Sequence, residues 1–386
     1  MVIEPLSYYE KANLKDNPFK PTPNFAADPR ASIWVGYEKQ QRQLNKFLKR
    51  SLADQVGNIN FLMVYGDYGT GKSHALSWAR HRILHEEMDT YDAACYFIPT
   101  LRQENGKFSF ANAFQNDIVG KSNLVADLQV FHDFLVTCIT ARKDVGDLGD
   151  ISNEQTIEKL IPAVELSNFA KDLYQCKNVD GFAALLTAKS DYQAMTIFTR
   201  IVNLFVHEMV ITDTDHKRFK KATYLFIDEL DDLDRASVKE AREVNDLLRH
   251  IYDNCPNCFC IIIALSAEIS QLPVLFFDYV LRRINRQIEL IGLDKDDAVD
   301  FVKDILSMNR LDLEGEGDFF PFEKAAIEAI ASQLTEITPA KIVDTMQQVI
   351  EEARLAGHNP DDGPVSSDFL DEHDIVEEVL GEGGIA

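Results

Sequence analysis

Two glycines, a lysine and a serine in residues 64–76, VYGDYGTGKSHAL, have the types and spacing of a phosphate-binding loop. Gly66 and Gly71 bracket four residues and run directly into Lys72 and Ser73. The glycines let backbone N–H groups wrap phosphates, the lysine reaches the outer phosphates, and the serine hydroxyl holds Mg²⁺. An apolar run before the loop and a helical pattern after it supply the required context. The predicted nucleotide contacts are Gly66, Asp67, Tyr68, Gly69, Thr70, Gly71, Lys72, Ser73 and His74.

A pair of carboxylates, Asp228 and Glu229, follows an apolar run in ATYLFIDELDDLD (222–234). Hydrolysis of a phosphate bond needs a carboxylate near the metal and a group that positions the attacking water. We expect Asp228, with Ser73, at the metal, and Glu229 at the water. The alternative is a buried strand that ends in a solvated acidic turn, and the upstream glycine loop favours the catalytic interpretation.

A serine and three arginines follow in chain order. Ser266 ends the apolar run CFCIIIALSAE (258–268), where its side chain could orient the water; the alternative is a strand-end serine in a turn. Arg282, Arg283 and Arg286 precede the short run QIELIGL. One of them could reach a γ-phosphate held by a neighbouring subunit, a contact that accelerates such reactions by orders of magnitude. The alternative is a set of surface arginines on a helix.

The elements that must position these side chains follow from the apolar pattern. Ala75, Leu76, Ala79 and Ile83 recur at helical spacing after the glycine loop, so a helix is expected there. Alternating strands and helices predict an α/β fold with a parallel sheet and right-handed crossovers. The expected strands are 61–65, 94–98, 223–227, 259–265 and 287–290, and the expected core helices are 73–87 and 237–252.

The order of these motifs resembles the AAA+ ATPases. IWVGYEKQQRQL (33–44), the glycine loop, FIDE, the Ser266 strand and the arginines follow one another as in that family, and the resemblance covers roughly residues 14–356. It is closest to the initiator-like branch, which includes the origin-recognition ATPases and bacterial relatives of the ExeA, TniB and TnsC kinds. The segment NPF…P in LKDNPFKPTPNFAADPRASIWVGYEKQ is similar to the ExeA-like group.

The resemblance implies ATP and Mg²⁺ as cofactors, a homo-oligomer, and an adenine pocket near Val35 and Gly36. It also implies a second sensor on a lid helix, usually an arginine that follows a proline. Here Lys341 follows Pro339. Lysine keeps the charge of arginine but cannot form its bidentate hydrogen bonds. The replacement of arginine by Lys341 therefore puts the coupling between nucleotide and lid in question.

The expected organisation is a P-loop AAA+ core with two helical additions. An N-terminal segment with the adenine-pocket motif (1–60) precedes the core (61–291), and a helical lid (292–356) and an acidic tail (357–386) follow. A helical insertion at about 101–220 occupies a crossover that one helix could make. We expect this insertion to bind a partner, and the alternative is an enlarged core. The tail is too short for a winged-helix domain, which favours a compact adaptor ATPase over a replication initiator.

Charge and composition limit the class of protein. The chain has 386 residues and a net charge of −24, and residues 291–386 hold 6 Lys/Arg against 24 Asp/Glu. The acidity therefore belongs mainly to the C-terminal part, and DNA binding elsewhere is not excluded. No apolar stretch approaches ~20 residues, no signal peptide is evident, and six cysteines suggest reduced thiols. We expect a cytoplasmic protein without a membrane span.

Two short clusters invite a binding interpretation. HKRFKKAT (216–223) interleaves Lys217, Arg218, Lys220 and Lys221 with an aromatic residue and suits sequence-independent DNA contact; the alternative is a solvated loop. CPNCFC (255–260) has one C-x-x-C pair, but a zinc site needs four ligands, so burial explains these cysteines better.

Two functions fit this sequence. The first is an ATP-controlled oligomeric switch in a DNA transaction, such as regulation of transposition or replication. The second is an ATPase of a defence complex, for example antiviral, or of a signalling complex, in which the insertion or the acidic lid binds a protein effector. Both use the same site residues, so the motifs do not separate them.

Overall fold

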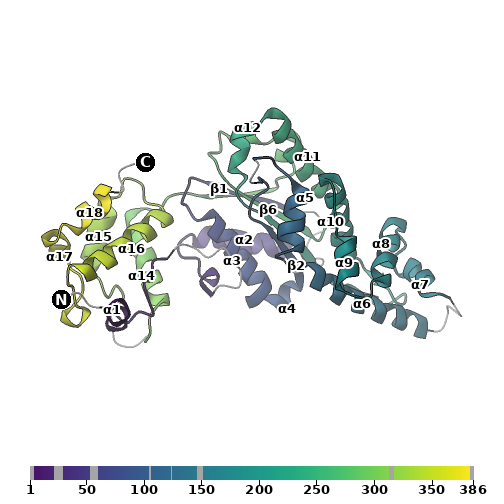
Figure 1. Cartoon of the computed structure of the whole chain (residues 1–386), viewed down its shortest axis with the longest axis horizontal. Helices are drawn as coiled ribbons and strands as arrows, with labels where there is room; N and C mark the ends of the chain where they lie inside the picture. The colour runs from purple at the N-terminus through teal and green to yellow at the C-terminus, as the bar shows by residue number, and fades with distance from the viewer. Residues whose placement is uncertain are drawn as a thin grey trace. The chain divides into compact units, whose positions relative to one another are not determined.

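The computed structural model describes residues 4–20, 29–52, 60–103, 106–122, 124–145, 151–312 and 317–382. Parts of the predicted N-terminal segment, insertion and tail lie outside these ranges. The chain divides into two compact units (Figure 1). The first unit comprises Met1–Gln41, Gly66–Ser77 and Leu290–Ala386, and the second comprises Arg42–Tyr65 and Trp78–Glu289.

A five-stranded sheet forms the centre of the second unit. Its order is β2-β5-β6-β1-β7. β2 and β5 pair in parallel from Ala93↔Ala222 to Ile98↔Ile227, and β5 and β6 pair in parallel from Thr223↔Phe259 to Ile227↔Ile263. The predicted α/β fold with a parallel sheet flanked by helices is confirmed. The strands are β1 (Asn60–Gly66), β2 (Ala93–Ile98), β5 (Ala222–Ile227), β6 (Phe259–Ser266) and β7 (Arg286–Leu290).

The apolar runs of the sequence explain the central strands. Every residue of β5 is buried, as is every residue of β6 before Ser266, which is the pattern of parallel strands covered on both faces. A capping box between Ser237 and Glu240 begins α11, the helix that follows residues 228–234, called here the acidic turn. The core helices are α2 (Glu38–Arg50), α3 (Lys72–His81), η2 (Arg82–Glu86), α4 (Met88–Tyr91), η4 (Leu230–Arg235), α11 (Val238–Asn254), α12 (Leu272–Leu275) and α13 (Asp278–Leu281).

The segment between β2 and β5 is helical, as expected, and part of it belongs to the sheet's own core. The ring of Tyr96 in β2 meets that of Phe198 at 6.0 Å, and Phe198 meets Phe110 at 6.1 Å. The helices further along build a layer around α6, which contacts α7, α8 and α9. The elements are α5 (Phe110–Ala113), η3 (Phe114–Val119), α6 (Leu124–Asp144), α7 (Asn153–Leu160), α8 (Val164–Gln175), α9 (Val179–Leu185), α10 (Asp191–Phe205), β3 (Met209–Val210) and β4 (His216–Lys217).

One helix of the described residues, α6, is long and apolar enough to cross a membrane by length and composition. Core helices pass the same test. Leu128, Phe131 and Leu135 on α6 are fully buried against neighbouring elements. The apolar composition of α6 is therefore accounted for, on this face, by packing within the protein.

The helices of the first unit come from both ends of the chain. Tyr8 on α1 (Pro5–Lys11) is fully buried, and its hydroxyl lies 3.1 Å from Nδ1 of His358. Asn17 of the NPF motif donates from Nδ2 to the carbonyl of Gln347 at 3.4 Å. The other elements are η1 (Pro29–Ser32), α14 (Lys295–Met308), α15 (Lys324–Gln333), α16 (Pro339–Leu355), η5 (Pro360–Asp362), α17 (Ser367–Glu372) and α18 (Ile375–Glu382).

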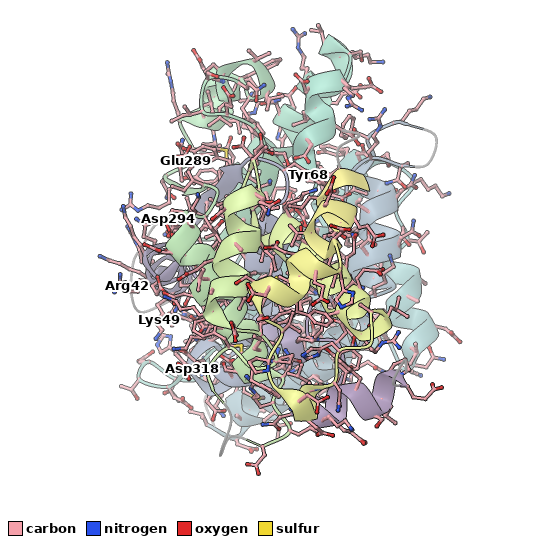
Figure 2. All side chains as sticks on the ribbon, turned by 90° about the vertical axis from the view of Figure 1, so that its left-hand side faces the viewer. Arg42, Lys49, Tyr68, Glu289, Asp294 and Asp318 are labelled. Atoms are coloured by element: carbon pink, nitrogen blue, oxygen red, sulfur yellow. The ribbon has the colours of Figure 1, made fainter. Side chains whose placement is uncertain are left out.

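The range predicted as an acidic tail (357–386) contains η5, α17 and α18. α17 contacts α15, and α18 contacts α16. Leu370 and Ile375 are buried there, because apolar residues at helical spacing lie among the acidic ones. Figure 2 looks onto this group of helices and shows the oxygen-tipped side chains that cover it, with Asp294 and Asp318 labelled.

Candidate active site

The glycine loop between β1 and α3 has a backbone that only glycine adopts without strain. Gly66, Gly69 and Gly71 have φ values of +149°, +80° and +92°. A Cβ on Gly66 would lie 2.0 Å from the carbonyl oxygen of Leu290, so the close approach of these two backbones requires glycine. A Cβ on Gly71 would meet nothing within 4 Å. Open space beside an exposed backbone is what a bound phosphate requires.

Lys72 and Ser73 lie at the start of α3, directly after this loop. The Lys72 ammonium donates to the carbonyls of Gly66, at 3.1 Å, and Asp67, at 2.7 Å, and the residue is only 8% exposed. The charge is thus held on the loop. Ser73 is exposed, and Tyr68 at the tip is 88% exposed (Figure 2). The loop residues fit the phosphates of a nucleotide, with cation and hydroxyl side by side.

The segment predicted to hold adenine is tied to the same helix. Nε2 of His74 is hydrogen-bonded to the carbonyl of Ile33, and burial lowers the pKa of His74, so the ring is neutral. Val35 is buried, and Gly36 has a φ of +64°. The Tyr37 hydroxyl donates to the carbonyl of Ile291 at 2.6 Å. The residues proposed for the base and for the phosphates therefore belong to one compact unit.

The start of α16 contacts the glycine loop directly. The backbone N–H of Ala340 donates to the carbonyl of Gly69 at 3.1 Å. The Thr338 hydroxyl caps the helix by accepting from the N–H of Lys341 at 3.3 Å. Lys341 is half-buried in the first turn, where the helix dipole is positive. The predicted sensor residue, Lys341, thus directly follows Ala340, whose backbone contacts the loop.

The two predicted carboxylates follow β5 in the second unit. The Asp228 N–H donates to the carbonyl of Ile98 at 2.9 Å, and its Oδ1 accepts from the Glu229 N–H at 2.9 Å. Asp228 is buried, whereas Glu229 is exposed and has a φ of +51°. Partial burial, and then the charges of Asp228, Asp231 and Asp232, raise the pKa of Glu229. A raised pKa suits a carboxylate that exchanges protons with water.

Ser266 ends β6, the strand beside β5, and the acidic turn holds it. The Asp231 carboxylate accepts a hydrogen bond from the backbone N–H of Ser266. Asp232 forms an ion pair with Arg102, with 2.5 Å between Nη1 and Oδ1. A hollow of about 280 Å³ opens here, lined by Asp231, Asp232, Asp234, Arg235, Ser266, Gln271 and Leu275.

Asp231, Asp232 and Arg102 were missed by the sequence analysis. The run DELDDLD (228–234) pointed to further site residues, because it holds more acidic residues than one metal ion and one water require. Only Asp228 and Glu229 were given roles. Arg102 gave none, since 130 residues separate it from Asp232.

The three candidate arginines lie in different surroundings. Arg283 is committed within the subunit: it binds both carboxylate oxygens of Asp253, at 2.8 and 2.9 Å, and the carbonyl of Tyr279 at 2.6 Å. Arg286 donates to the carbonyl of Asn285 at 2.8 Å. Arg282 at the end of α13 is exposed, and no hydrogen bond or ion pair joins its side chain to the described residues.

The basic cluster near β4 is largely neutralised. Arg218 pairs with Glu208, and Lys220 pairs with Asp92 at 3.1 Å. Lys221 donates to the backbone carbonyl of Asp89 at 3.4 Å, and Lys217 lies half-buried in β4. The aromatic residue of this cluster, Phe219, packs inward. Its ring lies 4.9 Å from that of Phe205, so it is not placed to stack on a base.

No metal site formed by protein side chains alone is found in the described ranges. No group of three or more His, Cys, Asp or Glu there is placed to hold an ion, and Cys255 and Cys260 are buried. A Mg²⁺ ion that is held by phosphates, waters and one or two side chains needs no such group.

No family model matches the sequence, and no curated protein matches it. Solved structures with a similar fold include the Aeropyrum pernix ORC2 protein, at 12% identity and a TM-score of 0.49 over 92% of this chain and 72% of that one. Drosophila ORC bound to DNA matches at 13% and 0.49 over 100% and 69%. A Walker-type ATPase of Pyrococcus abyssi matches at 14% and 0.49 over 95% and 77%. These similarities concern the fold alone.

The sheet places the predicted motifs at the ends of its strands. It carries the glycine loop after β1 and the acidic pair after β5, and β6 lies between these two strands. A helical C-terminal part follows β7. These elements follow one another in the order that the sequence motifs predicted.

Proposed function

We propose that the chain is an ATP hydrolase, with the glycine loop as its ATP-binding element and Asp228 and Glu229 as its hydrolytic carboxylates. The observation that carries the proposal is the glycine loop. Its three glycines adopt left-handed backbone conformations, open space lies beside Gly71, and the Lys72 ammonium is held on the loop. The loop therefore combines open space beside the Gly71 backbone, a cation and the exposed Ser73 hydroxyl.

Each predicted residue then has a role. The loop from Gly66 to His74 would hold the phosphates, and Val35 with Gly36 would line the base. Ser73 and Asp228 would bind Mg²⁺, which supplies charge neutralisation at the phosphates when it is bound. Glu229 would position the attacking water, and Ser266 would orient that water from the end of the neighbouring strand.

The contact between α16 and the loop supports a switch. Because Ala340 is hydrogen-bonded to Gly69, a phosphate that reshapes the loop also acts on the first turn of α16. Lys341 in that turn would respond to the nucleotide's charge. Arg282, which is exposed and has no hydrogen bond or ion pair to the described residues, is the best candidate to act on a nucleotide in a neighbouring copy. ATP binding would thus favour an oligomer, and hydrolysis would release it.

We retain a DNA transaction, of the transposition or replication kind, as the proposed setting. The Drosophila relative in fold is a complex with DNA, and the region before residue 291 carries little net charge. A second candidate, an ATPase that acts on a protein effector in defence or signalling, is favoured by one observation. Arg218 and Lys220 are already paired with carboxylates, whereas Val164 and Tyr192 in the helical insertion are 72% and 74% exposed.

Binding of a fluorescent ATP analogue tests the proposal. The wild type should bind the analogue in the presence of Mg²⁺, and Lys72→Ala should bind it at least tenfold more weakly, because the charge on the loop is lost. Lys341→Ala should weaken binding less. Equal binding by the wild type and Lys72→Ala would show that the loop is not the nucleotide site.

A further inference from the structure

Three loops meet at the edge where β2, β5 and β6 end. β2 and β5 are parallel neighbours that finish in register at Ile98 and Ile227, and β6 pairs with β5 on its other side. The loop after β2 carries Arg102, the turn after β5 carries the acids from Asp228 onward, and β6 ends at Ser266. Side chains of the middle turn contact both neighbouring loops.

We propose that Asp231 and Arg102 are positioning residues for hydrolysis: Asp231 fixes the end of β6 on the acidic turn, and Arg102 ties the loop after β2 to that turn. The proposal rests on the ATP hydrolase function proposed above. It gives a positioning role to two side chains that have no assigned contact with the nucleotide.

Asp231 acts through the backbone of Ser266. Its carboxylate accepts the hydrogen bond of the Ser266 N–H at the end of β6. Asp231 lies two residues after Glu229 on the same turn. The bond therefore fixes the spacing between the residue that positions the water and the residue that orients it. Small displacements of such groups are costly in rate.

The backbone of Arg102 is fixed by contacts within the loop after β2. Its N–H donates to the Thr100 hydroxyl at 3.1 Å, and it forms an antiparallel bridge with Phe108. From this short loop its guanidinium reaches Asp232 at 2.5 Å, and both side chains are 35% exposed. A partly exposed pair contributes little to stability. Its geometric effect is to tie the loop after β2 to the acidic turn.

The Asp231 test separates positioning from binding and folding. Asp231→Ala should lower kcat for ATP at least tenfold and leave KM and analogue binding unchanged, because the binding residues belong to the first unit. Asp231→Asn should recover much of the rate, since the amide oxygen still accepts from the Ser266 N–H. Asp234→Asn, in an exposed carboxylate of the same turn, is the matched control and should match the wild type.

The Arg102 test uses the same separation of turnover from binding. Arg102→Ala should lower kcat and leave analogue binding unchanged, and Arg102→Lys should restore part of the rate. Wild-type kcat in Arg102→Ala or in Asp231→Ala overturns the inference while ATP hydrolysis stands. If Asp231→Ala does not fold, as judged by circular dichroism, the Arg102 variants decide. A wild type that binds the analogue but never hydrolyses ATP overturns the hydrolase proposal and this inference together.

Discussion

The backbone N–H of Ala340 donates a hydrogen bond of 3.1 Å to the carbonyl of Gly69. The first turn of α16 is therefore attached to the glycine loop, and the Thr338 hydroxyl that caps this turn lies beside Gly69 as well. The loop proposed to bind phosphate and the start of α16 share this contact. This contact is where nucleotide binding and movement of the C-terminal helices would be coupled.

Gly69→Ala should weaken both stability and nucleotide binding. Gly69 has a φ of +80°, and a Cβ there would lie 3.0 Å from the Thr338 hydroxyl and 3.2 Å from the Ala340 Cβ. The left-handed backbone alone costs a non-glycine residue about 1–2 kcal/mol. The unfolding free energy and the Kd for the ATP analogue report the two effects. Gly317→Ala is the control, because a Cβ there meets nothing within 4 Å; equal behaviour of the two variants would remove the proposed role of this contact.

Hydrolysis should be lost at acidic pH through Glu229. Partial burial and the neighbouring Asp228, Asp231 and Asp232 raise its pKa, so the carboxylate form is depleted at a higher pH than for an ordinary glutamate. Turnover should fall as pH falls through this raised pKa, because only the carboxylate accepts a proton from water. The pH profile of kcat checks this, with the profile of Glu229→Gln as reference. An acid limb that survives in Glu229→Gln belongs to another group.

Arg282 and Arg283 should give different phenotypes. Arg283→Ala breaks a partly exposed bidentate pair with Asp253 and should cost about 1 kcal/mol of unfolding free energy with little effect on turnover. Arg282→Ala should leave stability unchanged and lower turnover by about a thousandfold if it acts in a neighbouring copy. Mixing Arg282→Ala with Lys72→Ala should then restore part of the activity. No recovery on mixing, with full turnover by a monomer, would exclude action in trans.

The structure changes how the DNA hypothesis must be tested. Reversing all four cluster charges would place glutamate beside Glu208 and Asp92, so glutamine is the better substitution. If the cluster contacts phosphates, the Lys217, Arg218, Lys220 and Lys221 to glutamine variant should lose duplex binding, and wild-type binding should weaken steeply with salt. Fluorescence anisotropy with a non-hydrolysable ATP analogue measures both, with Lys239→Gln as control. A wild type that binds no duplex at low salt would leave the protein-effector function as the better proposal.

Patterns within short stretches of sequence predicted the strands and the glycine loop, which are each formed by consecutive residues. β5 and β6 are continuous apolar runs, and the glycine loop is a contiguous motif, so each could be placed from the residues themselves. The contacts that complete the site are not local. Asp231 meets Ser266 across 35 residues, and Tyr8 meets His358 across 350. No periodicity specifies such pairs, because they depend on which strands become neighbours and on how the chain's two ends pack.

The helical insertion shows the same limit. Its helices were expected from their apolar spacing, but whether they form a separate module depends on which side chains reach the sheet. Phe110 and Phe198 join the core of the sheet, whereas α7 and α9 pack on α6. The segment is therefore partly an enlarged core and partly an added layer, and the sequence alone could not divide it.

The most direct test of the central claim compares ATP turnover and ATP binding in the wild type, Lys72→Ala and Glu229→Gln. Lys72→Ala should lose both, because the charge on the loop that holds the phosphates is gone. Glu229→Gln should bind ATP as tightly as the wild type and hydrolyse it at least a hundredfold more slowly, because only the group that positions water has changed. Wild-type turnover by Glu229→Gln would contradict the account.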